Sequence, residues 1–180
     1  LEASSHGLKQ NRLDGLNFKT GIFTNLSRDH LDYHKSYKDY LSSKLLLFKN
    51  LLKKNSNVIT DINIPEYKNI KSITKRKKLK ISTIGSNNSS LEIIKHRYED
   101  DKQFLQIKYN NKIYLLSVNL IGKVQIKNIL MAMLAAEKSG LKFDKLVKTI
   151  NKITNVNGRL EKIGKLKNNS KVILDYAHTP

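Results

Sequence analysis

Residues 18–52, FKTGIFTNLSRDHLDYHKSYKDYLSSKLLLFKNLL, place a strand, a polar loop and a helix in direct succession. The pattern of 18–24 predicts a short strand, and 25–30 form the polar loop that follows it. Ser36, with Asp39 three residues later, fits a capping box, so a helix is expected to begin near Ser36 and to continue to about Leu52. Strands that alternate with helices in this way indicate an α/β fold.

The rest of the chain continues this alternation. Short alternating runs predict strands over 58–62, 80–84, 91–97, 103–109 and 112–118. Asn110-Asn111 predicts a hairpin turn between the last two strands, because Asn tolerates positive φ. Helices are expected over 122–138, ended by Gly140, and over roughly 143–153. Residues 172–175 are expected to form a short buried strand, and the hairpin makes an antiparallel element inserted in the α/β fold.

The composition is strongly basic and contains no cysteine. The 180 residues carry 34 Lys and Arg against 15 Asp and Glu, a formal net charge of +19. Only five of these cations are Arg, and Lys is abundant together with Asn and Ile, which indicates compositional bias rather than a face built for nucleic acid. The run Lys75-Arg76-Lys77-Lys78 is expected to be a solvated face in a polar connecting region. The lack of cysteine excludes disulfides, thiolate zinc sites and cysteine nucleophiles.

One lysine stands where an apolar side chain is expected. On a helical wheel with Tyr37 at zero, the apolar stripe of the helix after Ser36 extends about 60° to either side. Lys44 falls in the middle of that arc, among Tyr40, Leu41, Phe48, Leu51 and Leu52. A cation there is unfavourable unless it is paired, deprotonated or modified. Two interpretations remain open: Lys44 extends past the stripe to solvent, or it points into a site where its charge is altered.

Two polar clusters precede this helix. Asp29, His30, Asp32 and His34 lie within six residues, and such a cluster either binds a hard cation or caps the helix with carboxylates. Ser4-Ser5-His6 places serines beside a histidine, but neighbours in sequence rarely form a catalytic dyad, and no G-x-S-x-G elbow surrounds them. Neither cluster fixes a function by itself.

Together, these stretches resemble the Mur ligase family. The resemblance is carried by LEASSHGL at 1–8, Gln10, Arg12, FTNLSRDHLDYH at 23–34, Lys44, GRLE at 158–161 and DYAHTP at 175–180. It is strong over 1–52 and 156–180, and it rests on position and pattern over 57–120. Within the family, the SSHGL and SRDHLDYH strings most resemble the branch that adds the third residue of the peptidoglycan peptide.

The resemblance implies an ATP-dependent amide-bond ligase. ATP phosphorylates the carboxylate of UDP-N-acetylmuramoyl-L-alanyl-D-glutamate, and the amine of the third amino acid attacks the acyl phosphate. The implied partners are this UDP-muramoyl dipeptide, ATP and an amino acid in the bacterial cytoplasm, without nucleic acid and without a membrane span. Because a triphosphate and a carboxylate must approach each other, the reaction needs Mg2+ and protein cations to screen their charges.

The same resemblance assigns the carboxylate-side residues. Glu2 and His30 match Mg2+ ligands. Lys44 matches the lysine that the family carbamylates with CO2, and as N6-carboxylysine it becomes an anion that can also approach the metal. Lys44 and His30 are therefore the implied catalytic residues, and this agrees with the position of Lys44 on the wheel.

The remaining implied residues bind substrates. Ser4, Gln10 and Arg12 match contacts to the UDP-muramoyl peptide, and the guanidinium fork of Arg12 suits an oxyanion. On the ATP side, Arg159 matches a phosphate contact, Asp175 a ribose contact and Asn128 the second Asn of an adenine-side motif. These three are the implied ATP-binding residues.

Two departures from the family pattern bear on the domain organisation. Val124 and Gln125 stand where the adenine-side motif has an aromatic residue and an Asn. No G-x-x-x-x-G-K-[ST] occurs, so the phosphate loop is expected upstream of Leu1. The expected fold is thus the central ATPase domain of a Mur ligase, a mostly parallel sheet flanked by helices with a small antiparallel element, incomplete at its N-terminus. Residues 1–156 would form this domain and 157–180 a hinge and the first strand of a C-terminal domain, inactive as an isolated piece.

Three alternatives stay open. Another Mur ligase or a folylpolyglutamate synthetase would share the reaction and the fold. A basic nucleic-acid-binding module would explain the charge but gives no reason for the position of Lys44. A non-catalytic homologue would explain the departures but not the retention of Glu2, His30 and Lys44. The third amino acid could be diaminopimelate, lysine or another.

Overall fold

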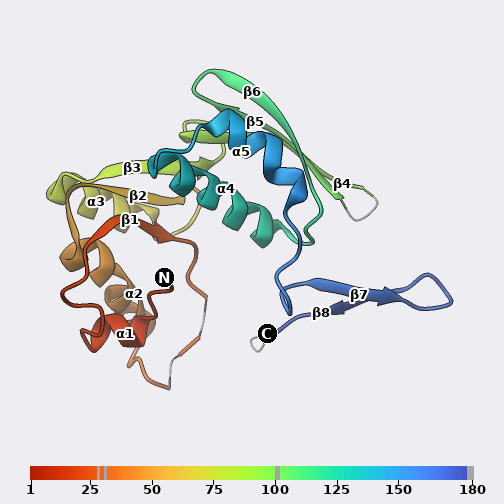
Figure 1. Ribbon diagram of the computed structural model, residues 1–180. Coiled ribbons are helices and arrows are strands. Elements are labelled where there is room, and N and C mark those ends of the chain that lie inside the picture. The colour runs from red at the N-terminus through yellow and green to blue at the C-terminus, as the bar shows by residue number, and fades with distance from the viewer. Residues whose placement is uncertain (28, 31, 100–101, 178–180) are drawn as a thin grey trace. The chain divides into compact units, whose positions relative to one another are not determined.

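The computed structural model describes residues 1–27, 29–30, 32–99 and 102–177. Arg28 and Leu31 of the loop string, and 178–180 of the C-terminal string, lie outside the described residues. The chain forms two compact units, Leu1–Gly85 and Ser86–Pro180 (Figure 1).

The first unit is built from three parallel strands and the helices that connect them. The strands are β1 (Phe18–Phe23), β2 (Leu52–Asp61) and β3 (Lys80–Gly85), and the helices are α1 (Ser5–Lys9), α2 (Tyr37–Leu46) and α3 (Tyr67–Lys77). In their register, Gly21 lies opposite Val58, and Val58 lies opposite Ile81. Parallel strands need crossover connections, which α2 and α3 provide. The core of this unit contains Phe23, Leu45, Phe48, Leu52, Val58, Ile70, Ile73 and Leu79.

Helix α2 begins where the sequence predicts. The Asp39 N–H donates a hydrogen bond of 3.1 Å to Ser36 Oγ, which caps the first turn. The α-helix ends at Leu46, and a π-helical turn, η1 (Leu47–Leu51), leads directly into β2 at Leu52. The strand predicted over 58–62 is therefore longer than expected, because it starts as soon as the helical turns stop.

The sequence does not predict α3, and the expectation of a polar connecting region there is wrong. Lys75, Arg76 and Lys77 form the last turn of this helix, and Lys78 ends it in the left-handed conformation. Its buried side consists of Ile70, Ile73 and Thr74, which follow the i, i+3, i+4 spacing of an amphipathic helix although β-branched residues are weak helix formers. Cations at a helix C-terminus interact favourably with its dipole. In addition, Lys77 Nζ donates to the Lys49 carbonyl oxygen at 2.5 Å.

The second unit contains three antiparallel strands followed by two helices. The strands are β4 (Leu91–Glu99), β5 (Lys102–Tyr109) and β6 (Lys112–Val118), and the helices are α4 (Lys123–Lys138) and α5 (Phe143–Thr149), which ends in a 3-10 turn, η2 (Ile150–Lys152). Asn110 and Asn111 have φ of 49° and 61°, as the predicted hairpin turn requires, and Gly140 ends α4 with φ of 103°. Parallel strands with crossover helices and an antiparallel β element confirm the predicted α/β class.

The last two strands form a small second sheet. Strand β7 (Glu161–Lys165) pairs antiparallel with β8 (Lys171–Leu174). The expectation that 172–175 form a buried strand is wrong, because Ile173 and Leu174 are 43% and 42% exposed. An apolar run predicts burial only where a second layer covers it, and β8 has β7 as its strand partner in a sheet of two.

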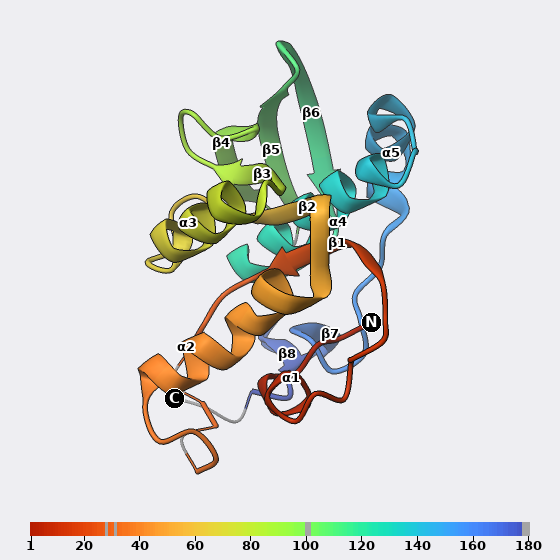
Figure 2. The same cartoon turned by 90° about the vertical axis from the view of Figure 1, so that its left-hand side faces the viewer.

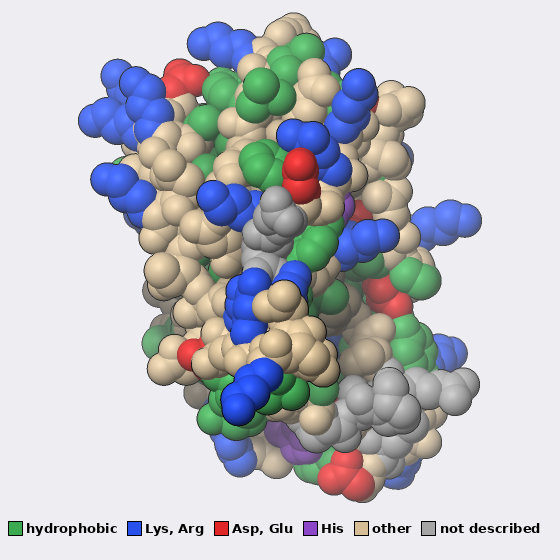
Figure 3. All heavy atoms as spheres, turned by 90° about the vertical axis from the view of Figure 1, so that its right-hand side faces the viewer, with side chains coloured by type: hydrophobic (Ala, Val, Ile, Leu, Met, Phe, Trp, Pro, Cys, Tyr) green, Lys and Arg blue, Asp and Glu red, His purple; other side chains and the backbone are tan. Residues whose placement is uncertain are grey.

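On the face drawn in Figure 3, Lys and Arg side chains are spread among polar and apolar ones and do not gather into a single stripe. Within the described ranges, no helix has the length and apolar character needed to cross a bilayer.

Candidate active site

Helix α1 carries the residues predicted to bind the UDP-muramoyl substrate. Ser4 caps the helix, since its Oγ accepts a hydrogen bond of 3.0 Å from the Gly7 N–H. Gln10 ends the helix, and its side-chain amide donates to Tyr33 Oη at 3.1 Å. The Arg12 N–H donates to the Gly7 carbonyl at 2.9 Å. Ser4, Gln10 and Arg12 are all exposed. They lie at the two ends of α1, so the structure brings the three together on one short segment.

Gly7 lets two of these side chains approach each other. A Cβ at this position would lie 3.2 Å from Ser4 Oγ and 3.9 Å from Arg12 Cδ. Ser4 and Arg12 therefore both lie against the small surface that the missing side chain leaves open.

The loop after β1 presents His30. This residue has φ of 55°, and its N–H donates to Asp29 Oδ1 at 2.7 Å. The exposed His30 ring lies 5.1 Å from the His6 ring and 5.8 Å from the Tyr40 ring, measured between centroids. The loop is thus held against α1 on one side and α2 on the other.

Lys44 is partly buried on α2, as its position on the apolar stripe predicts. Tyr40, Phe48 and Leu52 of the stripe are buried, while Tyr37, the first residue of α2, is exposed. The Lys44 ammonium lies 5.4 Å from the centroid of the Tyr40 ring. Burial lowers the pKa of Lys44, and the negative charges of Glu2 and Asp29 oppose this shift in part. Glu2 and Lys44 therefore act on each other.

The predicted metal ligands do not form a conventional metal cluster. Among the described residues, no group of three or more His, Asp or Glu side chains could hold an ion. His30 instead contacts Tyr40 and Asp29, while Lys44 lies over the Tyr40 ring and interacts with the charges of Glu2 and Asp29. An ammonium cannot ligate a cation, so this set becomes a possible Mg2+ site only if Lys44 carries an acidic group.

His34 and Tyr40 are buried beside these residues and were not among the predicted site residues, although His34 belongs to the polar cluster expected to bind a cation or cap the helix. His34, on the loop, and Tyr40, on α2, have rings 4.9 Å apart and 23° from parallel. His34 Nε2 lies 2.9 Å from Ser5 Oγ. The polar cluster at 29–34 drew attention to His34, but periodicity does not reveal a buried partner 29 residues away.

In the second unit, a set of hydrogen bonds joins the segments that carry the predicted ATP-binding residues. The Tyr176 N–H, directly after Asp175, donates to the Gly158 carbonyl at 2.9 Å, and Gly158 directly precedes Arg159. From α4, the Gln125 amide donates to the Arg159 carbonyl at 3.3 Å. Asn128 lies one turn further along α4, and Asn128, Arg159 and Asp175 are exposed.

Gly158 is required at this junction. Its φ is 70°, in the left-handed region that favours glycine, and a Cβ there would overlap the ring of Tyr176. The Gly158 N–H also donates to Glu161 Oε2 at 2.7 Å. Backbone geometry therefore sets the spacing between the Arg159 and Asp175 segments.

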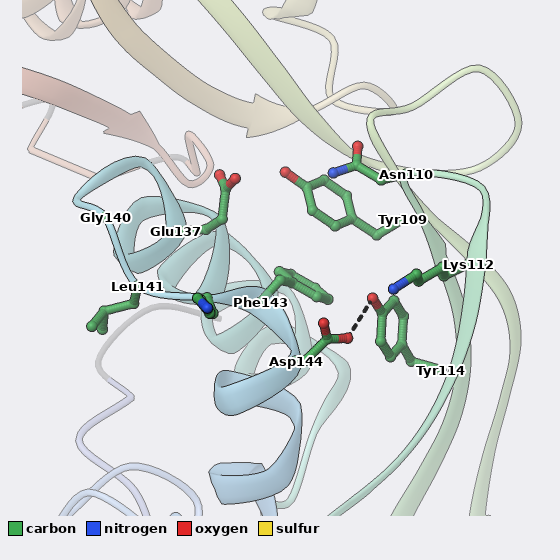
Figure 4. Close-up of a pocket in the computed structure, with 10 residues that line it drawn as sticks. Tyr109, Asn110, Lys112, Tyr114, Glu137, Gly140, Leu141, Phe143 and Asp144 are labelled. Carbon is green, nitrogen blue, oxygen red and sulfur yellow. Dashed lines mark hydrogen bonds between the residues drawn. The ribbon is translucent and has the colours of Figure 1, made fainter.

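A separate pocket of about 420 Å³ lies between the β5–β6 turn and the α4–α5 corner. Figure 4 shows Phe143 between Tyr109 and Tyr114, with the Tyr114 hydroxyl donating to Asp144 Oδ1 at 2.9 Å. The ring centroids of Tyr109 and Phe143 are 4.3 Å apart. None of the predicted site residues lines this pocket, and its aromatic packing joins the hairpin to the helices.

Comparison with known proteins matches residues 1–136 to the model of the Mur ligase middle domain. The chain belongs to the Mur ligase family. That match covers the parallel strands, the hairpin and most of α4, so family membership does not depend on the C-terminal strings.

Curated Mur ligases resemble the whole chain. It is 36% identical over 180 residues to the UDP-N-acetylmuramoyl-L-alanyl-D-glutamate–2,6-diaminopimelate ligase of Chelativorans sp. (strain BNC1), and 33% identical to the protein of that name from Agrobacterium fabrum. These alignments cover 100% of the chain but 37% of each relative. The chain therefore spans little more than a third of the length of these relatives.

Solved structures agree with the fold. A structure of a UDP-N-acetylmuramoyl-L-alanyl-D-glutamate–2,6-diaminopimelate ligase superposes with a TM-score of 0.84 at 29% identity, covering 99% of this chain and 37% of that one. A mutant FPGS from L. casei superposes over 92% of this chain and 40% of that one, with a TM-score of 0.71 at 16% identity, a likeness of fold alone.

Proposed function

We propose that this Mur ligase chain is the central part of an ATP-dependent ligase that adds 2,6-diaminopimelate to UDP-N-acetylmuramoyl-L-alanyl-D-glutamate. Support comes from the names of the relatives that match the full chain and from the arrangement of α1, the His30 loop and α2. ATP and a UDP-sugar are cytoplasmic metabolites, so we place the reaction in the bacterial cytoplasm, with no nucleic acid involved.

On the carboxylate side, each group has a distinct task. Arg12 would bind an anionic part of the UDP-muramoyl substrate with its fork, while the Ser4 hydroxyl and Gln10 amide orient it. Glu2, His30 and carbamylated Lys44 would hold Mg2+, and these donors fit because two of the three supply oxygen. Bound there, Mg2+ would screen the negative charge of phosphate and carboxylate.

The observation that carries this proposal is the environment of Lys44. Its burial lowers the pKa and so enlarges the fraction of neutral amine, which is the form that attacks CO2. The amine nitrogen bonds to the CO2 carbon, one N–H proton leaves to solvent, and a carbamate anion remains. The same change removes a cation from a partly apolar stripe.

On the ATP side, Arg159 would contact a phosphate, Asp175 the ribose and Asn128 the adenine edge. The Gln125 amide, which replaces the first Asn of the family motif, donates to the Arg159 carbonyl. Gln125 would thus position Arg159, the proposed phosphate contact, through this hydrogen bond. We further propose that 1–156 form the central ATP-binding domain and 157–180 the hinge into a C-terminal domain, so the isolated 180 residues have no ligase activity.

The test uses the full-length protein. ADP release should require UDP-N-acetylmuramoyl-L-alanyl-D-glutamate, ATP and 2,6-diaminopimelate together, with a product heavier by one amino-acid residue. Lysine in place of diaminopimelate should give much slower release. ADP release with a folate substrate, and none with the UDP-muramoyl dipeptide, would contradict the proposal.

Intact mass without acid tests the carbamate. In bicarbonate, the protein should gain the mass of one CO2, and Lys44→Ala should abolish both this gain and ligation. Short carboxylic acids should restore part of the activity of that variant. Lys38→Ala, an exposed lysine on the same helix, is the matched control and should behave like the wild type. A fully active Lys44→Ala would disprove the assignment.

A further inference from the structure

Ser5 and His34 form a buried hydrogen-bonded pair that the proposed reaction does not use. Ser5 Oγ lies 2.9 Å from His34 Nε2. Ser5 is 2% exposed, and the His34 side chain is 0% exposed. The serine thus pairs not with the adjacent His6 but with a histidine from the loop that leads into α2.

The other side of the His34 ring faces Asp39. His34 Nδ1 lies 3.6 Å from Asp39 Oδ2, a carboxylate oxygen that also accepts a hydrogen bond of 2.7 Å from Lys9 Nζ. This separation exceeds hydrogen-bond distance, so the buried Nδ1 atom has no hydrogen-bond partner among the described residues, and Ser5 is the hydrogen-bonded neighbour of the ring. Burial lowers the pKa of His34.

Ser5, His34 and Asp39 follow one another as in an acyl-transfer triad, but Asp39 lies beyond hydrogen-bond distance of the ring and burial excludes that chemistry. A nucleophile must reach its substrate, and Ser5 has almost no exposed surface. The pair must therefore act on the protein itself.

The ring of His34 contacts elements on both sides of the candidate site. On one side, Ser5 is the first residue of α1, which lies beside the N-terminal half of α2 (Figures 1 and 2). On the other side, the His34 N–H donates to the His30 carbonyl at 2.9 Å, and its ring stacks on Tyr40. Tyr40 in turn lies under the Lys44 ammonium.

We propose that His34 is a positioning residue, which holds α1 against α2 through Ser5 and Tyr40 so that the substrate-binding side chains of α1 keep one geometry relative to His30 and Lys44. The substrate-binding residues lie on and beside α1, whereas His30 and Lys44 lie on the loop and on α2. His34 contacts all three of these segments. This role rests on the proposed ligase function for its kinetic consequence but not for its structural one.

Three substitutions in the full-length protein separate the contacts of the ring. His34→Asn keeps a polar group at the Nδ1 position and removes the contact to Ser5. His34→Gln extends an amide to the Nε2 position and can still accept from Ser5. Ser5→Ala removes the partner, and Ser43→Ala is the matched control, because Ser43 is also buried but donates to the Asp39 carbonyl of its own helix.

The first readout is independent of activity. Hydrogen exchange at the α1 amides should be about tenfold faster in His34→Asn and Ser5→Ala, while amides of α4 exchange as in the wild type. His34→Gln should recover most of the protection, and Ser43→Ala should not change it. Unchanged exchange at α1 in His34→Asn would overturn the proposal.

The second readout is kinetic. In His34→Asn, KM for the UDP-muramoyl substrate should rise about tenfold with KM for ATP unchanged, and His34→Gln should restore it in part. Equal losses for both substrates, or equal losses in Ser43→Ala, would show a merely structural role and overturn the proposal. If the wild type ligates nothing, the proposed function fails, and the exchange experiment alone decides the role of His34.

Discussion

The two units differ in what they bury. Among the described residues, the first unit buries many polar side chains: Ser5, His34, Ser43, Thr60, Asp61, Glu66, Thr74, Ser82 and Thr83. In the described part of the second unit, Gln103 is the one buried polar side chain, and its amide donates to the Leu120 and Gly122 carbonyls at 2.5 and 3.2 Å. Burying a polar group is unfavourable unless it is hydrogen-bonded, so the first interior demands far more specific pairing.

The predicted site residues of the two units are therefore supported by different kinds of contact. In the first unit, the buried His34 contacts Ser5 of the helix that carries the substrate residues, the carbonyl of His30 and the ring of Tyr40 on α2. In the second unit, the segments of Arg159 and Asp175 are joined through the bond from the Tyr176 N–H to the Gly158 carbonyl, and the Gln125 side-chain amide donates to the Arg159 carbonyl. We therefore expect interior changes in the first unit to alter chemistry, and changes to the ATP-side residues of the second unit to leave stability intact.

Lys44→Met is the strongest test of this comparison. Methionine keeps the length without the charge, so ligation by the full-length protein should fall about 10³-fold. In CO2-free buffer, the free energy of unfolding should rise by about 1 kcal/mol, because a partly buried cation is removed. Urea unfolding and ADP release measure the two effects.

The pH dependence of this stability gain has a defined sign. The pKa of Lys44 in the folded state lies below its ordinary 10.5. At any pH below that lowered pKa, the Lys44 charge therefore destabilises the folded state by its full amount. The gain of Lys44→Met should shrink as the pH rises toward 10.5. A variant more active than a tenth of the wild type, or less stable than it, would contradict the prediction.

Tyr37→Phe tests a hydrogen bond between the exposed Tyr37 and the buried Glu66, which lies away from the substrate residues of the first unit. The Tyr37 hydroxyl donates to Glu66, which is 3% exposed, and the bond raises the pKa of Tyr37 to about 12. Loss of the donor should lower the free energy of unfolding by about 1–3 kcal/mol.

Because the pKa of Tyr37 is raised, its contribution is complete below the ordinary pKa of 10 and is lost as the pH rises through about 12. The difference between Tyr37→Phe and wild type should close over this window. Tyr67→Phe on α3, whose ring faces Lys71, is the control and should stay within about 0.5 kcal/mol at neutral pH. Equal destabilisation by both variants would count against a special role for the Glu66 bond.

Arg159→Lys tests the second unit. A lysine cannot bind phosphate with two parallel hydrogen bonds, so KM for ATP should rise about tenfold in the full-length protein. The free energy of unfolding should change by less than about 0.5 kcal/mol, since Arg159 is exposed. Arg97→Lys, in the same unit, should leave KM unchanged, and a large stability loss in Arg159→Lys would break the comparison.

The smallest effect is expected at the C-terminus of α3. Lys75→Gln with Arg76→Gln removes two cations from the last turn and should lower the free energy of unfolding by about 0.5 kcal/mol at low salt. The loss should nearly disappear at high salt, where the dipole interaction is screened. Thermal unfolding at two ionic strengths measures this, and a loss that is independent of salt would point to packing instead.

The sequence allowed most elements of the fold to be predicted, because their patterns are local. β1, the hairpin strands and α4 follow from period-2 and period-3.6 runs, with Asn110, Asn111 and Gly140 at the turns. Helix α3 was missed because Ile70, Ile73 and Thr74 give it a narrow apolar side of β-branched residues. β7 was missed because it is short and mostly polar.

The candidate site divides in the same way. Lys44 was found because a single charge interrupts a local stripe, and the family motif supplied the other residues. The pairing of Ser5 with His34 could not be predicted, since a buried hydrogen bond between distant segments leaves no periodic pattern. The exposure of Ile173 likewise depends on which layer covers β8, and strand propensity does not contain this information.

The connection between α2 and β2 has a consequence for how this domain can change. Five residues in a π-helical turn join the helix to the strand without a loop, so no flexible segment absorbs a change in length. Removing one residue between Leu46 and Leu52 would rotate α2 by about 100° relative to β2. Lys44 would then turn away from Glu2 while the strand kept its place. The rotational phase of the helix is thus set by the sheet, and insertions here should be far less tolerated than substitutions.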